Sequence, residues 1–522
     1  MTRDMRFPRH TIFILLTTLF SLFLNLSYGY RESDRRESNS SDNNTIEIGI
    51  RDVDSREIGS RDIDSRENYS RESEDTLTVS DAVRFLSKYV AIPSVSGQEN
   101  EAAYWLAQQC ADKGLHIEYI TNSPGSVNFT ASLYPLSSQK PNIVFLNHMD
   151  VVFAGDHKLW KYPPFDGVIA DERVWGRGSF DNKGLAVIQI FAVEQFVDLA
   201  AKEELPFNVT VLCVSGEETG GITGSALVAK DFIERLNPMV VIGEGGSGME
   251  DLSFLDGAGP LFGISIAEKG CMLVKLSWTS DNAGHASIAG NYASLMMING
   301  LHKLLNAPHP IILTREAELM FSSVGKKLGG IKGKVMSKPS SKLFMSFLKQ
   351  HALKNPELNE ILTNKITLST LETSKTSYNQ ISNVESAILD CRLLPGETPE
   401  DIINFIKNTI LDSLVQISVV EQGPVPLTTE PEYFFNLLAY AIESEFEGAS
   451  VVPMLLPAST DNSYFRALGV PVYGLNPMIV SPDQLKAIHS YDEFIKFVDV
   501  DRGIDVFVSF LKSALPVFDE RH

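Results

Sequence analysis

Residues 142–150 read Asn-Ile-Val-Phe-Leu-Asn-His-Met-Asp, an apolar run that ends in an imidazole and a carboxylate. Such a run is typical of a strand that is buried on both faces of a sheet. Two more apolar runs, 207–214 and 239–242, also end beside acidic residues, and 183–200 has the pattern of a long helix. Strands that alternate with helices predict an α/β fold with a mostly parallel sheet, whose sites lie at the carboxyl ends of the strands.

Two helices are predicted ahead of this sheet. Ser80 has the side chain of an N-cap and precedes an apolar helical stripe. A second helix is expected to have Ser96 as its cap, with Glu99 three residues later and Gly114 as its stop.

The pattern changes at about residue 269. From there to residue 422, amphipathic strands and helices flank a lysine-rich stretch, which predicts an inserted α+β domain. Buried strands and helices return afterwards, and the chain ends in a helix expected over 502–515. We therefore expect one α/β domain in two parts, 79–268 and 423–522, interrupted by 269–422.

Residues 1–29 have the pattern of an export signal. Three arginines precede an apolar stretch over 11–26, and small residues follow it. The stretch is shorter than the roughly 20 residues that a helix needs to span a bilayer. We therefore expect a cleaved signal and a periplasmic or secreted protein, and the alternative is a membrane anchor formed by 11–26.

Residues 30–78 contain a charged ten-residue repeat. Two copies read Glu-Ile-Gly-Ile-Arg-Asp-Val-Asp-Ser-Arg over 47–56 and Glu-Ile-Gly-Ser-Arg-Asp-Ile-Asp-Ser-Arg over 57–66. The segment has too little apolar surface to offset the entropy of ordering it, so we expect a disordered spacer.

The charge of the chain excludes one class of partner. It has 45 Lys and Arg against 66 Asp and Glu, a net charge of −21. A surface this negative repels phosphate backbones, so we expect no nucleic acid partner. The cysteines, Cys110, Cys213, Cys271 and Cys391, form no C-x-x-C pair, which leaves buried thiols or, in an exported protein, a disulfide.

Imidazoles and carboxylates gather at the predicted strand ends and in nearby turns. The candidates are His148, Asp181, Glu218, Glu244 and His489. Each alone has an ordinary alternative, such as a surface histidine or a solvated acidic loop. Adjacent anions such as Glu217 and Glu218 repel each other unless a cation neutralises them. Two imidazoles and three carboxylates are a ligand set for a pair of Zn²⁺ ions, with Co²⁺ or Mn²⁺ as alternatives.

Eight motifs follow one another between residue 80 and the end of the chain. They are His148-Met-Asp-Val-Val, Trp160 with Pro163-Pro-Phe-Asp-Gly167, Trp175-Gly-Arg-Gly with Asp181-Asn-Lys-Gly, Glu217-Glu-Thr-Gly, Glu244-Gly-Gly, Gly284-His-Ala-Ser287, Asp390-Cys-Arg392-Leu-Leu-Pro-Gly and His489-Ser. In this order they resemble the M20 family of metallopeptidases and aminoacylases. The segment over 160–178 is most similar to its Gly-X carboxypeptidase and N-acyl-amino-acid hydrolase branch.

The resemblance implies a dinuclear zinc site. Asp181 is then the bridging ligand, His148 and Glu244 complete one metal site, and Glu218 and His489 complete the other. The family pattern is departed from at several positions, including Phe153, Gly243, Ala286 and Asp492, but no metal ligand is lost.

The resemblance also implies catalytic roles. Asp150 orients His148, and Glu217 is the general base that takes a proton from the metal-bridging water and returns it to the leaving amine. His285 stabilises the oxyanion at a scissile carbonyl, often that of the partner subunit. Arg392 and Asn383 contact the terminal carboxylate or the carbonyl of the substrate. A salt bridge on the strand surface is the alternative for Arg392.

The expected activity is metal-dependent hydrolysis of an amide bond next to a free carboxylate. The enzyme is then a carboxypeptidase or an N-acyl-amino-acid amidohydrolase, acting on small peptides or N-acyl amino acids. The family resemblance makes 269–422 a lid and a homodimer interface. Two alternatives are a non-catalytic M20-like metal-binding module or receptor, which the presence of Glu217 and Asp181 disfavours, and an adhesin that acts through the 30–78 repeat.

Overall fold

The structure is a computed structural model that describes residues 79–123, 126–249, 259–281, 284–285, 291–352, 355–373 and 380–519. The predicted export signal (1–29) and the predicted spacer (30–78) lie outside these ranges. Within the ranges, the structure has no helix of the length and apolar character needed to cross a bilayer.

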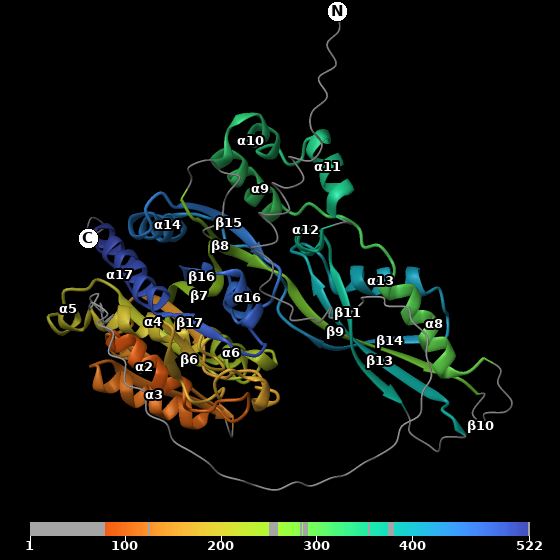
Figure 1. The fold of residues 1–522 in the computed structure, drawn as a ribbon, viewed down its shortest axis with the longest axis horizontal. Coiled ribbons are helices and arrows are strands. Elements are labelled where there is room, and N and C mark those ends of the chain that lie inside the picture. Colours follow the sequence, from red (N-terminus) through yellow and green to blue (C-terminus); the bar gives the residue numbers. More distant parts are fainter. Residues whose placement is uncertain are drawn as a thin grey trace, which may run out of the picture. The chain divides into compact units, whose positions relative to one another are not determined.

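An eight-stranded sheet forms the centre of the fold (Figure 1). In spatial order its strands are β1 (His116–Ser123), β2 (Ser126–Ser132), β6 (Asn208–Val214), β3 (Asn142–His148), β7 (Pro238–Met249), β16 (Val472–Ile479), β8 (Leu261–Glu268) and β15 (Ser450–Leu456). Strands β6, β3, β7 and β16 run parallel, and so do β8 and β15, whereas the pairs β1–β2, β2–β6 and β16–β8 are antiparallel. The predicted α/β class is confirmed, with antiparallel strands added to a parallel core.

Both faces of this sheet are covered, as the apolar run over 142–147 predicts. In β3, Phe145 contacts Phe507 and Phe510 of the C-terminal helix on one face. Its neighbours Val144 and Leu146 join a buried cluster on the other face. Alternate side chains of one strand therefore enter two separate cores.

The helices divide between these two faces. The first face carries α2 (Asp81–Val90), α4 (Lys183–Glu194), α14 (Tyr433–Glu445) and α17 (Phe497–Asp519), which pack on one another, and α3 (Asn100–Asp112) beside α2. The other face carries α6 (Ser225–Asp231), α7 (Ile233–Leu236) and α15 (Asn462–Arg466). The helix predicted over 183–200 is divided, because α4 ends at Glu194 and a short α5 (Val197–Ala201) follows.

The predicted caps have different outcomes. Ser80 caps α2, since its side chain accepts a hydrogen bond from the Val83 amide. For α3 the predicted cap is wrong, because this helix begins at Asn100 and its N-cap residue Glu99 makes no side-chain capping bond, whereas the predicted stop at Gly114 agrees with its end at Asp112. The Ser96 hydroxyl instead donates to Asp150, 2.7 Å away.

A four-stranded antiparallel sheet forms a second layer. Its order is β11 (Lys365–Thr373), β13 (Val384–Leu393), β9 (Gly270–Thr279) and β14 (Val415–Gln422), and α8 (Ala293–Leu305) and α13 (Pro399–Ile410) cover one face. Alternate residues of β9, ending at Trp278, are buried against these helices. The chain passes from the large sheet to this one between β8 and β9, at Glu268 and Gly270.

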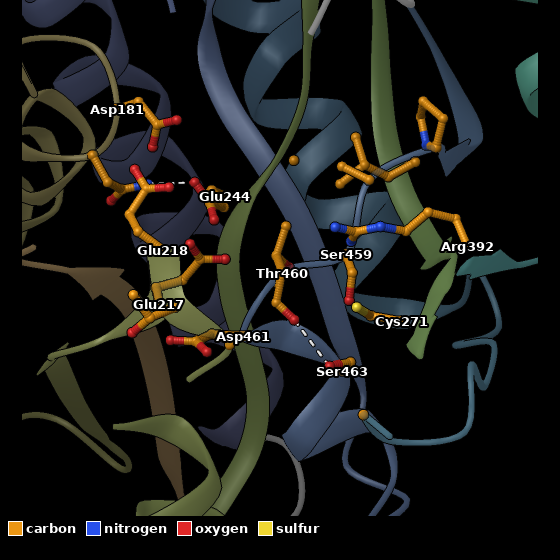
Figure 2. Close-up of a pocket in the computed structure, with 18 of the residues that line it drawn as sticks. Asp181, Glu217, Glu218, Glu244, Cys271, Arg392, Ser459, Thr460, Asp461 and Ser463 are labelled. Carbon is orange, nitrogen blue, oxygen red and sulfur yellow. Dashed lines mark hydrogen bonds between the residues drawn. The ribbon is translucent and has the colours of Figure 1, made fainter. Parts of the chain in front are cut away.

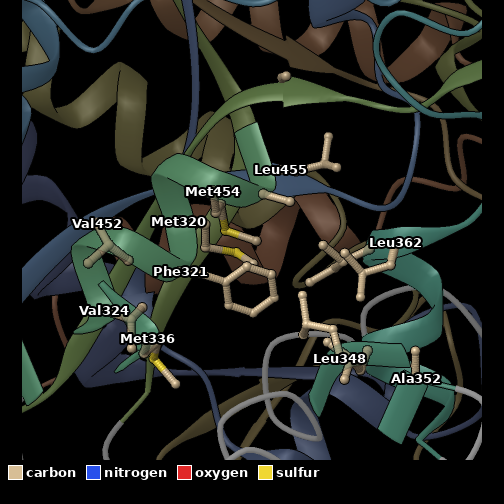
Figure 3. Close-up of a cluster of buried hydrophobic side chains, with 14 of the residues drawn as sticks. Met320, Phe321, Val324, Met336, Leu348, Ala352, Leu362, Val452, Met454 and Leu455 are labelled. Atoms are coloured by element: carbon tan, nitrogen blue, oxygen red, sulfur yellow. The ribbon is translucent and has the colours of Figure 1, made fainter. Parts of the chain in front are cut away.

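Four more helices follow α8 and pack on the large sheet. They are α9 (Arg315–Leu328), α10 (Gly330–Met336), α11 (Lys342–Ala352) and α12 (Pro356–Leu362). Figure 3 shows Met320 and Phe321 of α9 beside Met454 and Leu455 of β15. These helices belong to the segment 269–422 in the chain, but their core is shared with the eight-stranded sheet.

Two small sheets complete the fold. In the first, β5 (Arg173–Trp175) lies between β4 (Val168–Ala170) and β17 (Phe494–Lys496). Its register places Trp175 opposite Phe494, so the loops that follow Trp175 and precede Phe494 start side by side. The second pairs β10 (Gly284–His285) with β12 (Gln380–Ile381), and α16 (Pro482–Ala487) precedes β17.

Candidate metal centre

His148, Asp181 and Glu244 form the first group of converging ligand atoms. His148 ends β3, Asp181 lies in the loop before α4, and Glu244 lies within β7, which is longer than the 239–242 run suggested. Nε2 of His148 is 3.1 Å from Oδ1 of Asp181 and 3.7 Å from Oε2 of Glu244. Atoms that bind one tetrahedral Zn²⁺ at about 2.1 Å lie roughly 3.4 Å from one another. The three side chains therefore fit one metal ion.

Asp181, Glu218 and His489 form the second group. Nε2 of His489 is 3.2 Å from Oδ2 of Asp181 and 3.2 Å from Oε1 of Glu218. The two oxygens of Asp181 thus face different groups, which is the arrangement of a carboxylate that bridges two ions. All five residues predicted as metal ligands lie together in the structure.

The ring of His148 is oriented as a ligand. Nδ1 is 2.9 Å from the main-chain oxygen of Asp150, and a carbonyl oxygen only accepts hydrogen bonds, so Nδ1 carries the proton. Nε2 then points at the carboxylates of Asp181 and Glu244. Burial opposes a charge on this ring, but the Glu244 charge and the hydrogen bonds to nearby carboxylates raise the pKa of His148 well above its usual value. A cation at Nε2 satisfies the same carboxylates.

Asp150 connects the ends of two neighbouring strands. Because β3 and β6 run parallel with His148 opposite Val214, the residues after both strands emerge together. The carboxylate of Asp150 accepts hydrogen bonds from the amides of Glu217 at 3.1 Å and Glu218 at 3.2 Å. It lies 3.6 Å from Nδ1 of His148, so the closer partner of the ring is the main-chain oxygen of Asp150 rather than its side chain.

Negative charge is concentrated around this centre. Burial and the charge of Glu244 raise the pKa of Glu217, and burial and the charge of Asp181 raise the pKa of Glu218. Burial likewise raises the pKa of Asp461 to about 8. Burial opposes a charge on His489, but hydrogen bonds to Asp181 and Glu218 raise the pKa of this imidazole to about 11. So many buried anions favour bound cations, which offset their repulsion.

The loop of Asp181 is held by a residue from the end of the chain. The carboxylate of Glu493 accepts hydrogen bonds from the amides of Asp181 and Phe180, both at 3.0 Å, and of Gly178 at 3.1 Å. It also pairs with the Arg177 guanidinium at 2.6 Å. The next residue, Asn182, donates to Glu244 at 2.6 Å, so the loop is fixed on both sides of Asp181.

The two groups open into a cavity of about 500 Å³. Figure 2 shows Asp181, Glu217, Glu218, Glu244 and Asp461 on one side and Arg392 with Cys271 on the other, with Thr460 between them. The first side comes from the large sheet and the second from the four-stranded sheet. The cavity thus has one anionic wall, and its other wall carries the Arg392 guanidinium beside the carboxylate of Asp390.

Arg392 lines this cavity and is already paired. Its Nε and Nη2 donate to the two carboxylate oxygens of Asp390 at 2.9 and 3.0 Å. Asp390 uses two of the five guanidinium N–H groups. The predicted salt bridge on the strand is therefore present, and it does not exclude a contact between Arg392 and a substrate.

Of the two remaining predicted residues, Asn383 alone has a side chain that the structure describes. Asn383 is exposed, accepts a hydrogen bond from the Ser280 amide at 2.9 Å and is not among the described residues that line the cavity. His285 lies in β10, opposite Gln380 of β12, and its side chain lies outside the described part of the structure.

Sequence reasoning missed several residues of the site. They are Ser96, Arg177, Asn182, Asp461 and Glu493. Asp461 had a usable signal, since it follows the apolar strand β15 as the other candidates follow theirs. Arg177 and Asn182 lie inside motifs already singled out, and Glu493 follows the His489-Ser motif, but the partners of all three are distant in the chain.

The family model and the relatives that match this chain point to the same family. Residues 144–513 match the family model for peptidase family M20/M25/M40. The chain is 28% identical over 392 residues to the probable carboxypeptidase S-like 2 of Dictyostelium discoideum, a match that covers 72% of both chains. It is 24% identical over 373 residues to the human N-fatty-acyl-amino acid synthase/hydrolase PM20D1, covering 70% of this chain and 72% of that protein.

Solved structures share the fold. The M20 family metallo-carboxypeptidase Sso-CP2 from Sulfolobus solfataricus superimposes with a TM-score of 0.63 at 18% identity, covering 83% of this chain and 99% of that one. Human carnosine dipeptidase 1 superimposes with a TM-score of 0.58 at 16% identity, covering 82% and 95%. The family match spans most of the described residues and all five candidate metal ligands. The chain therefore belongs to peptidase family M20/M25/M40, a family of metal-dependent hydrolases.

Proposed function

We propose that this protein hydrolyses an amide bond next to a free carboxylate, as a carboxypeptidase or an N-acyl-amino-acid amidohydrolase. Both activities are the same reaction on different acyl groups. The observation that carries the proposal is the convergence of two ligand groups on Asp181, beside Glu217, in a cavity whose other wall holds Arg392. Relatives named as carboxypeptidase-like proteins and N-fatty-acyl-amino acid hydrolases support the substrate class.

Two divalent ions, with zinc favoured by the mixed imidazole and carboxylate ligands, are part of this proposal. His148 and Glu244 would hold one ion, Glu218 and His489 would hold the other, and Asp181 would be a ligand of both. Bound there, the ions supply Lewis acidity and an activated water. Asp150 positions both strand ends through its hydrogen bonds to Glu217 and Glu218.

Glu217 is the proposed general base. Its carboxylate accepts the proton of the attacking water and delivers it to the amide nitrogen as the C–N bond breaks and the new C–O bond forms. The products are a carboxylic acid and an amine. Glu217 lines the cavity beside Glu218 and Glu244, which agrees with this role.

Arg392 is the proposed partner of the substrate carboxylate. A guanidinium binds carboxylates through two parallel N–H···O bonds, and Arg392 lines the same cavity as the proposed metal ligands. Asn383 stays a weaker proposal for the same task, since it is exposed and outside the described lining of the cavity.

His285 is proposed to act on a partner subunit. Strand β13 carries Arg392 near one end and Val384 at the other, beside β12, with which β10 pairs. At about 3.3 Å per residue, eight residues of strand separate these ends by roughly 25 Å. At that distance from Arg392 the proposed role of His285 requires the cavity of a second subunit, so a homodimer through 269–422 is part of the proposal. Light scattering coupled to gel filtration tests the dimer.

The proposed activity is tested with the purified chain. The protein is dialysed against a chelator, resupplied with zinc and assayed on a panel of blocked dipeptides and N-acyl amino acids. We expect zinc to restore cleavage and Glu217→Gln to lower kcat by about 10²–10⁴-fold while both ions stay bound. Glu447→Gln, at an exposed position far along the chain, is the matched control and keeps full activity.

Two results would overturn the proposal. Full cleavage by Glu217→Gln would assign the proton transfer elsewhere. No cleavage of any panel member by the zinc-loaded protein would favour the alternative of a metal-binding module. Export to the periplasm or the medium is a separate part of the proposal, based on residues 1–29, and N-terminal sequencing of the exported chain tests it.

A further inference from the structure

One segment of this acidic protein has the opposite charge. Residues 322–352, here called the basic segment, contain no Asp or Glu, whereas the whole chain has a net charge of −21. All of its lysines are exposed: Lys326, Lys327, Lys332, Lys334, Lys338, Lys342 and Lys349. The hydrolase proposed above uses none of them.

The inner side of the basic segment is fully packed. Met336 of α10 and Leu348 of α11 are buried in the cluster that these helices share with β15 (Figure 3). Phe344 of α11 belongs to the same cluster. Helices α9, α10 and α11 contact one another in chain order (Figure 1). Their orientation is therefore set by the core beneath them, and their outer side is left to solvent.

The outer side combines the lysines with two protruding aliphatic side chains. Ile331 in α10 is 75% exposed and Leu343 in α11 is 68% exposed. Each is next to a lysine in the chain, Lys332 and Lys342 respectively. Among the described residues, the only ion pair that this segment's lysines form joins Lys327 to Glu443 at 3.6 Å. The exposed surface of the segment thus includes both lysines and apolar side chains.

We propose that the basic segment docks the protein on an anionic membrane surface. Lysines are attracted to acidic lipid headgroups, and aliphatic tips between them enter the boundary of the acyl chains. An acidic polypeptide is complementary to the lysines alone and gives no reason for Ile331 and Leu343 to protrude. A patch kept only for solubility gives no such reason either, because exposed Ile and Leu oppose solubility.

Membrane docking of this kind depends on several weak contributions to the binding free energy, one from each lysine. A lysine near an anionic surface strengthens binding by about fivefold, so three of them contribute about 100-fold. The effect falls within a Debye length of about 8–10 Å at physiological salt, so only lysines on the docking side contribute. The net negative charge of the rest of the chain opposes contact through any other side.

Vesicle co-sedimentation tests the proposal with the full-length chain. Vesicles of phosphatidylcholine alone are compared with vesicles that also contain phosphatidylserine, at low and high salt. We expect binding to the anionic vesicles that high salt abolishes. The triple variant Lys332→Gln, Lys334→Gln and Lys338→Gln should weaken this binding by about 100-fold, and Ile331→Ser with Leu343→Ser by about tenfold.

The matched control neutralises three exposed lysines on other elements. Lys202→Gln, Lys230→Gln and Lys407→Gln change the net charge by the same amount and should leave binding within about twofold. Residues 11–26 are the same in every variant, so binding through that apolar stretch is equal in all of them. Hydrolysis of a soluble substrate is measured in parallel and should not change, which separates this proposal from the proposed function.

Three outcomes would overturn the docking proposal. The first is equal binding by the triple variant and its matched control. The second is binding that does not depend on phosphatidylserine. The third is lysine-dependent binding to polyglutamate without binding to anionic vesicles, which would assign the segment to an acidic polypeptide.

Discussion

Arg177 and Glu493 form a buried ion pair, with Nη1 2.6 Å from Oε2, between residues 316 positions apart in the chain. The two side chains are 2% and 1% exposed. Arg177 also donates to the main-chain oxygen of Ser490 at 2.7 Å. Because Glu493 binds the Asp181 amide and Ser490 follows His489, this pair joins the loops that carry two proposed metal ligands.

Replacing Glu493 with Gln should destabilise the protein. The change leaves Arg177 as a buried charge without its counter-ion, which costs about 3–5 kcal/mol. Urea denaturation of the variant measures this loss of unfolding free energy. Adding Arg177→Met should recover part of it, since the double variant has no uncompensated charge. A loss below about 1 kcal/mol for Glu493→Gln would mean that water reaches Arg177.

The same variant should bind metal less tightly. Altering a residue that orients metal ligands through hydrogen bonds typically lowers the affinity for the metal by about 10–100-fold. Titration of the metal-free protein with zinc, followed by calorimetry below the unfolding transition, measures the change. Ser96→Ala, which removes one hydrogen bond to Asp150, is expected to have a smaller effect of the same sign.

Asp181 belongs to both groups of candidate metal ligands, so two variants should differ in metal content. Asp181→Asn removes a ligand from both groups, so it should lose both ions, whereas Glu244→Gln removes one ligand from the first group only and should keep the ion held by Glu218 and His489. Elemental analysis after gel filtration gives the metal content per chain. Equal loss in the two variants would contradict a bridging role for Asp181.

The ligand positions could be predicted from the sequence because neighbouring parallel strands end at one edge. His148 ends β3 and Glu217 follows β6, and these two strands pair in register, so an apolar run followed by a polar group was sufficient to bring them together. Asp181 and His489 lie in loops, and only the order of motifs pointed to them. Their approach depends on the β5–β17 pairing, which no local pattern reveals.

Other features depend on contacts that no local pattern reveals. Ser96 has the spacing of a capping residue, but its partner Asp150 is 54 positions away and binds it instead. Helices α9–α12 follow the four-stranded sheet in the chain, yet pack against β15, which comes about 90 positions after α12. In both cases local propensity is overridden by tertiary packing, which sequence patterns do not encode.

Removing the Arg392 guanidinium should affect only substrates with a free carboxylate. Arg392→Met is expected to lower kcat/KM for such substrates by about 10–150-fold, the value of hydrogen bonds between charged groups. It should leave the amidated forms of the same substrates within about threefold. Asp390→Asn is the matched variant, since it weakens the competing salt bridge and should not lower kcat/KM for the carboxylate form. Equal losses on both substrate forms would assign Arg392 a structural role.

Lys269 gives a prediction for the pH dependence of stability. Its side chain is fully buried, and burial lowers the pKa of the amine to about 8 from its ordinary 10.5, although Glu360 lies 3.5 Å away. Between these pH values the unfolded chain holds a proton that the folded chain has lost, so this group makes stability rise with pH. Below pH 8 the buried charge costs about 3 kcal/mol.

Lys269→Met should therefore raise the unfolding free energy at pH 7 by up to about that amount, and the gain should shrink towards zero by about pH 10. Glu360 keeps Lys365 as a partner in the variant, so it is not left unpaired. Denaturation of both proteins at pH 7 and pH 10 measures the difference, and an equal difference at the two pH values would show that Lys269 titrates in the folded protein as it does in water.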